Sequence, residues 1–238
     1  MKNIFLTMMA VALLVVGLTA CGGYDKHPFK DISETYLNTV QKIIDDPSLV
    51  EDMEKDKSLA ESFAKNFENK MHSLAEDLYG KTIKVEISDG LGFEVVSNEG
   101  RIGEGDIHGD NLHFPINIDL KSIDESLARD NFSKLVAYFC DEDGKAVYVE
   151  GIGEECPLKK GQEVESDTRS LDSMVKEGTI IHRGIRIGIE FSDMQPFLTV
   201  SKIVIEKYDY DKSREIEDRN REMEKEFIRK VKEAARHR

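Results

Sequence analysis

Apolar residues recur every three or four positions across residues 29–80, the spacing of helices that bury one face. Pro47 interrupts the first stripe, and capping-box patterns begin at Ser48 and again at Ser58. Gly80 is placed to end the last helix. We therefore expect a helical hairpin or bundle of two or three helices. Its core-facing residues would be Phe29, Ile32, Tyr36, Val40 and Ile43, then Ala60, Phe63, Phe67, Met71, Leu74 and Leu78.

Residues 81–210 change to an alternation of apolar and polar positions, which is the period of half-buried strands. The alternating segments are 83–87, 112–120, 135–140, 146–150, 181–191 and 203–205. The acidic, glycine-containing stretch 141–145 has the chemistry of a hairpin turn. Short helices are expected near residues 123–129 and 171–177. The pattern predicts an α+β chain in which an antiparallel β-sandwich follows the helices.

Residues 211–238 carry mixed charges around a narrow apolar seam formed by Ile216, Met223, Phe227 and Val231. Oppositely charged residues four apart support a long, charged C-terminal helix. The seam spacing of seven, four and four is not a sustained heptad, so a coiled coil is not indicated. Three uses of the seam stay open: packing on the chain's own domain, docking an envelope protein partner in a groove, or lying on a membrane.

The first residues have the layout of a cleaved secretory signal. Lys2 supplies a positive start, residues 4–16 are apolar apart from Thr7, and Leu18-Thr19-Ala20-Cys21 follows. This resembles the bacterial lipobox, in which a leucine, two small residues and a cysteine direct lipidation and cleavage. The resemblance implies a signal peptide over residues 1–20, acyl chains on Cys21 and a lipidated tether over residues 21–28.

An uncleaved transmembrane anchor is the alternative for this segment. The apolar stretch is about 17 residues long, at the lower limit for spanning a bilayer, and it lacks a flanking basic cluster. We therefore expect a lipid-anchored protein of the cell envelope. Gly22 after the cysteine resembles the outer-membrane default in hosts with two membranes. The sequence leaves open whether the domain faces the periplasm or the outside.

The formal net charge of −14 argues against nucleic acid as a partner, because phosphates must be neutralised by lysine and arginine. The same excess disfavours adhesion of the chain as a whole to an anionic membrane surface. The commonest meaning of such a surplus is solubility. Charge therefore excludes a class of partners without naming one.

Cys140 and Cys156 are the two cysteines left once Cys21 carries lipid. In an oxidising envelope such a pair is a disulfide candidate. Pairing requires the chain to bend back at Gly151 or Gly153, so that the two Cα atoms come within reach. The sequence leaves bridged and unbridged forms equally open.

Two histidines form the one arrangement that resembles a metal site. If Asp110 and Asn111 form a two-residue turn, His108 and His113 face each other across the hairpin, with Asp106 and Glu104 following on the same face. Two imidazoles with a carboxylate suit zinc or copper. The alternative is a solvated hairpin face that binds nothing.

No sequence motif assigns a reaction to the chain, so an enzyme is the less favoured class. Residues 137–161 resemble the immunoglobulin-like modules of envelope proteins, and this likeness implies a sandwich fold without a function. We expect a non-catalytic binding or scaffolding lipoprotein without a cofactor. The alternative is a metal- or small-ligand-binding protein, or an enzyme, centred on the His108/His113 hairpin.

Overall fold

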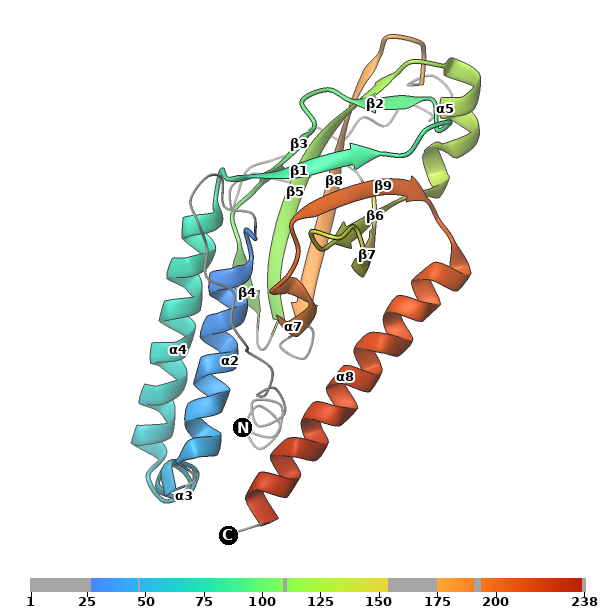
Figure 1. The fold of residues 1–238 in the computed structure, drawn as a ribbon. Helices are drawn as coiled ribbons and strands as arrows, with labels where there is room; N and C mark the ends of the chain where they lie inside the picture. Colours follow the sequence, from blue (N-terminus) through green and yellow to red (C-terminus); the bar gives the residue numbers. More distant parts are fainter. Residues whose placement is uncertain (1–26, 47, 109–110, 154–174, 191–193, 237–238) are drawn as a thin grey trace.

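A computed structural model describes residues 27–46, 48–108, 111–153, 175–190 and 194–236, which form a mixed α+β fold (Figure 1). Its helices are α2 (Lys30–Asp45), α3 (Ser48–Lys55), α4 (Lys57–Leu78), α5 (Glu125–Asn131), the 3₁₀ helix η1 (Phe132–Lys134), α7 (Met194–Phe197) and α8 (Tyr210–Arg236). Its strands are β1 (Thr82–Ile87), β2 (Phe93–Val95), β3 (Glu99–Ile102), β4 (Asp106–His108), β5 (Asn111–Ser122), β6 (Leu135–Cys140), β7 (Ala146–Gly151), β8 (Ile180–Glu190) and β9 (Lys202–Lys207).

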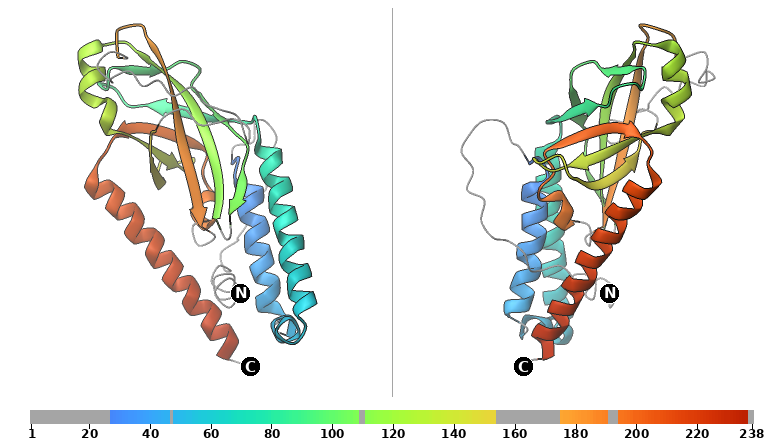
Figure 2. Two further views of the ribbon diagram at one scale, coloured as in Figure 1. Left: turned by 180° about the vertical axis from the view of Figure 1, so that it is seen from behind. Right: turned by 45° about the vertical axis from the view of Figure 1, so that its right-hand side comes forward.

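The N-terminal segment forms three helices, and α2 lies beside α4 with α3 at their far end (Figures 1 and 2). Tyr36 and Phe67 join α2 and α4 through an edge-to-face contact with ring centroids 6.0 Å apart. The cap of α4 differs from the predicted box at Ser58, because the Asp56 carboxylate accepts the Ser58 and Leu59 amides instead. Gly80 has a φ of 79°, which confirms the predicted helix end.

The strands belong to one sheet with the order β2-β5-β3-β1-β9-β6-β7. Strand β5 is its longest member, pairing with β8 along one side and with β4, β3 and β2 in turn along the other. Strands β1 and β9 run parallel, whereas the other pairs are antiparallel. A bridge between Gly153, just after β7, and Gly184 in β8 brings the two edges of the sheet together.

The predicted two-layered, immunoglobulin-like sandwich is not confirmed, since the described strands share one hydrogen-bonded sheet that includes a parallel pair. Alternation correctly located strands with one buried face, such as β5 and β9, whereas β6 is buried on both faces. It carries no information on what covers that face. Here the curled sheet buries its inner face against itself and against the helices, so a second sheet is not needed.

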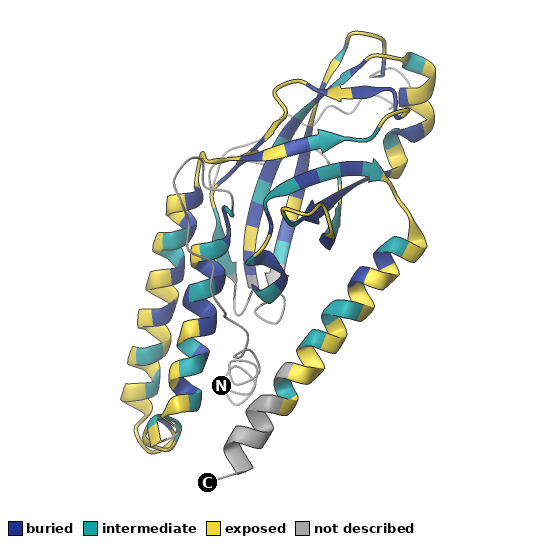
Figure 3. Ribbon diagram, viewed as in Figure 1, coloured by how far each residue is buried: buried dark blue, intermediate teal, exposed yellow. Residues whose placement is uncertain are grey.

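Aromatic rings connect the helices to the inside of the sheet. Phe29, just before α2, lies 5.5 Å from the Phe197 ring and 6.0 Å from the Phe114 ring, measured between centroids. Phe197 in α7 also meets Tyr148 of β7 at 4.9 Å and Phe139 of β6 at 5.7 Å. The buried positions in Figure 3 follow this arrangement, on the strands and on the side of α2 that faces them.

Other local predictions had mixed outcomes. The short helix expected near residues 123–129 is α5, and its N-cap is Asp124, whose carboxylate accepts the Leu127 amide at 3.0 Å. The helix expected near residues 171–177 lies mostly outside the described residues. Strands β2 and β3 were not predicted, because each is too short to show an alternating pattern. None of the described helices is both long enough and apolar enough to cross a membrane.

Candidate functional site

The first half of α8 is fixed to the outer face of the sheet. Ile216 is 3% exposed and packs with Val136, Tyr138 and Cys140. The Tyr138 hydroxyl lies 3.2 Å from the Ser213 hydroxyl, and the Lys212 ammonium lies 3.9 Å from the centre of the Tyr138 ring. These contacts make one seam residue part of the chain's own core.

Two polar side chains of α8 bind the backbone of strand β7. The Arg219 guanidinium donates to the Ala146 carbonyl, and the Asn220 amide donates to the Val147 carbonyl at 2.9 Å. Strand β7 lies at the end of the ladder, where carbonyl groups lack a full set of strand partners. The helix therefore covers part of a sheet edge as well as an apolar patch.

The structure describes the other predicted seam residues only in part. Met223 is half-buried, whereas the side chains of Phe227 and Val231 lie outside the described residues. Ile228, which the sequence pattern did not single out, is half-buried and packs against the main core. Packing on the chain's own domain therefore accounts for Ile216.

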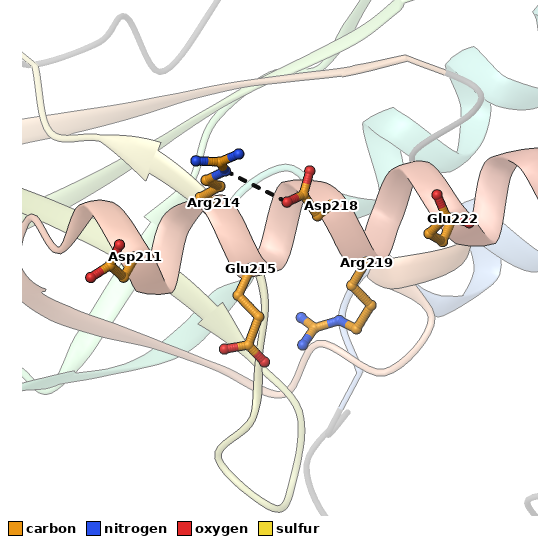
Figure 4. Close-up of a pocket in the computed structure, with 6 residues that line it drawn as sticks. All are labelled: Asp211, Arg214, Glu215, Asp218, Arg219 and Glu222. Carbon is orange, nitrogen blue, oxygen red and sulfur yellow. Dashed lines mark ion pairs between the residues drawn. The ribbon is translucent and has the colours of Figure 1, made fainter.

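The opposite side of α8 carries an acidic stripe of four exposed residues, Asp211, Glu215, Asp218 and Glu222 (Figure 4). Their spacing of four, three and four places them along one line of the helix. Arg214 and Arg219 flank the stripe, and the Arg214 Nε lies 3.7 Å from the Asp218 carboxylate. With these arginines the stripe borders a shallow hollow of about 470 Å³.

A second surface lies where residue 28 enters the fold. A groove of about 850 Å³ is bordered by Pro28 and by the beginnings of β1 and β9. Three lysines, Lys81, Lys84 and Lys202, line it together with hydroxyl and amide side chains and the carboxylates of Glu99 and Glu142. We call this surface the tether groove.

One carboxylate holds two of these lysines together. The Glu86 side chain accepts from Lys202 at 2.8 Å and from Lys84, and these hydrogen bonds lower the pKa of the Glu86 carboxyl. The pKa of the Glu86 carboxyl is lower in the folded state than in the unfolded chain. The network therefore stabilises the fold at pH values above the unfolded-state pKa. That contribution is lost as the pH falls through the folded pKa. Glu86 is partly exposed, so solvent screening keeps the effect small.

The prediction that His108 and His113 face each other directly is wrong. In the β4–β5 register His113 lies opposite Asp106, and His108 lies opposite Asn111.

The observed register does not pair His108 with His113, and the side chain of His108 lies outside the described residues. Glu104 is exposed and precedes β4, so it lies outside the paired segment. Within the part of the chain that the structure describes, no three His, Cys, Asp or Glu side chains are grouped to hold a metal ion. The zinc or copper hypothesis therefore loses the geometry on which it was based.

Cys140 is a buried free thiol, 2% exposed, beneath α8. Burial raises the pKa of the Cys140 thiol from 9.0 to about 11, which keeps it protonated at neutral pH. Since the folded-state pKa is the higher one, this contribution to stability is present below pH 9.0 and is lost as the pH rises through about 11. Cys156 lies outside the described residues, so the disulfide with Cys140 stays a prediction.

We expect native Cys140 to resist alkylation at pH 8, because alkylation needs the exposed thiolate. Unfolding in denaturant without reductant is expected to make this thiol react at the rate of a free cysteine. Peptide mass spectrometry would assign the modified residue. Fast alkylation of native Cys140 would contradict its burial, whereas a thiol that reacts only after reduction would establish the disulfide.

The chain has no significant match among protein-family models, curated proteins or solved structures. No relative therefore supplies a site that could be transferred to it.

Proposed function

We propose that this chain is a lipoprotein of the bacterial cell envelope, anchored through acyl chains on Cys21. It acts as a non-catalytic module that binds another envelope protein through α8. In a host with two membranes, the anchor is in the outer membrane. Several acyl chains on one cysteine give stable attachment where a single chain would not.

The anchor is supported by the sequence of residues 1–23 together with the position at which the fold begins. His27 and Pro28 are the first described residues, only a few positions after Cys21, and Phe29 is already 1% exposed. A lipid on Cys21 would therefore hold the folded part close to the bilayer, because so short a stretch of chain has little reach.

The observation that carries the binding role is the two-sided character of α8. One side is fixed by Ile216, Arg219 and Asn220, while the acidic stripe remains exposed along the other side. A helix that is already ordered loses little conformational entropy when a partner binds. Asp218 and Glu222 already pair with Arg221 and Lys225 within the helix. The partner that fits the stripe is a protein whose basic groups bind Asp211 and Glu215 and compete for the other two carboxylates, through charge complementarity.

In-cell cross-linking with mass spectrometry tests this role. The variant Glu215→Lys/Asp218→Lys/Glu222→Lys reverses the stripe while leaving the buried contacts of α8 in place. We expect one envelope protein to be captured by the native chain and its yield to fall at least tenfold with the variant, as expected for the loss of about 1.4 kcal/mol or more.

A matched control carries the same charge change on α3 and α4, at three exposed positions: Glu54→Lys, Glu61→Lys and Glu68→Lys. Capture that is equal in both variants would contradict the role of α8. Removing α8 altogether is a poorer test, because it would uncover Tyr138 and Cys140 and so disturb the fold.

A further inference from the structure

We infer that the tether groove is the membrane-facing surface of this protein and binds anionic phospholipid headgroups. The inference rests on the proposed lipid anchor, and it adds which face of the folded domain meets the bilayer. It is independent of the partner proposed for α8.

The tether begins at a fixed point beside this groove. Pro28 forms part of the groove wall, and the adjacent Phe29 is held between the rings of Phe114 and Phe197. The His27 imidazole lies 3.5 Å from the Glu142 carboxylate, which belongs to the same wall. The chain therefore leaves the folded domain at the groove.

Covalent geometry limits how far the groove lies from the lipid. Between Cys21 and His27 the chain spans at most about 20 Å, at roughly 3.3–3.6 Å per residue. A bilayer that holds Cys21 must therefore lie within about 20 Å of the point where the chain enters the fold, beside the tether groove.

The groove offers the chemistry that anionic headgroups require. Lys81, Lys84 and Lys202 supply ammonium groups that can donate to phosphate oxygens. Glu99 and Glu142 oppose this attraction and Glu86 binds Lys84 and Lys202, so the lysines and the carboxylates at the groove are equal in number. The short tether compensates, because it keeps the lysines at a high effective concentration near the headgroups.

The overall negative charge of the chain does not exclude such a contact. Charges separated by more than about 8–10 Å are largely screened at physiological ionic strength. A bilayer beside the groove therefore responds mainly to the charges that line the groove, whereas the acidic stripe on α8 contributes little. The net charge of −14 still predicts that the rest of the surface is held away from an anionic bilayer.

Site-specific fluorescence quenching tests the inference. The acylated, full mature protein is reconstituted in phosphatidylcholine vesicles with or without phosphatidylglycerol, in a Cys156→Ser background that avoids a second labelled thiol. A fluorophore is attached at Ser97→Cys in the groove or at Asp130→Cys on α5, and lipids carry a headgroup spin label. We expect quenching at position 97 to exceed that at position 130 at least threefold, and to increase with phosphatidylglycerol.

The charge variant Lys81→Gln/Lys84→Gln leaves the Lys202–Glu86 pair intact. It is expected to abolish the increase with phosphatidylglycerol, whereas the matched variant Lys65→Gln/Lys70→Gln on α4 preserves it. Equal quenching at positions 97 and 130 would overturn the inference, as would an unchanged response in the groove variant.

The mass of the reconstituted protein distinguishes failure of the proposed lipid anchor from failure of the membrane-facing groove. An unacylated N-terminus would refute the proposed anchor before any vesicle measurement. An acylated protein that shows no preferential quenching at position 97 would refute only the membrane-facing groove.

Discussion

Replacing Cys21 with serine is expected to abolish acylation and with it the membrane-bound mature protein. The lipid chains depend on the cysteine sulfur, and each buried CH₂ group contributes about 0.8 kcal/mol to membrane binding. Serine preserves the size of the residue but removes that sulfur. Membrane fractionation and intact mass are the measurements, and we expect an unacylated product of precursor size that retains residues 1–20.

The control for this substitution is Cys140→Ala. Cys140 is buried beneath α8, far from the lipobox in the sequence, so its loss is not expected to change acylation or membrane retention. A Cys21→Ser protein that is still processed to mature size and still acylated would contradict the lipoprotein proposal.

The second large effect is expected from Phe29→Ala. The Phe29 ring is 1% exposed and joins the start of α2 to Phe114 and Phe197. Its removal would leave a cavity between the helices and the sheet, at a cost of about 3–5 kcal/mol in the free energy of unfolding. Denaturant unfolding followed by circular dichroism measures that loss.

Tyr210→Ala is the matched aromatic control, because Tyr210 is 61% exposed. Its effect is expected to stay within about 0.5 kcal/mol. A Phe29→Ala protein that loses less than about 1 kcal/mol would mean that the tether does not begin at a fixed point on the fold.

Local patterns predicted the elements well where a single period ran long enough. The alternation over residues 112–120 corresponds to β5, and the charged tail corresponds to α8. The pattern fails inside β8 at Arg183, which is buried among isoleucines. Its guanidinium lies 4.3 Å from the centre of the Phe132 ring, a cation–π contact that compensates for burial and that no local pattern reveals.

Pairings between distant segments could not be predicted in the same way. Lys202 and Glu86 meet only because β1 and β9 run parallel, although 116 positions separate them in the chain. The polar positions of both strands were visible in the sequence, but their proximity was not. The tether groove is therefore a product of sheet topology.

The histidine hairpin shows how sensitive a proposed site is to register. The sequence indicated that His108 pairs with His113, whereas the observed register pairs His113 with Asp106 and His108 with Asn111. Likewise, the apolar spacing identified Ile216 on α8 but not what would cover it. The acidic stripe was visible as charge alone, and it became a candidate surface only once the buried side of α8 was known.

The most direct test of the account is the mass of the N-terminal peptide of the protein isolated from its native membrane. The account predicts that Cys21 is the first residue and that it carries covalently bound acyl chains. An N-terminal peptide that begins at Met1, or one in which Cys21 is unmodified, would contradict the lipid anchor and the membrane-facing groove that depends on it.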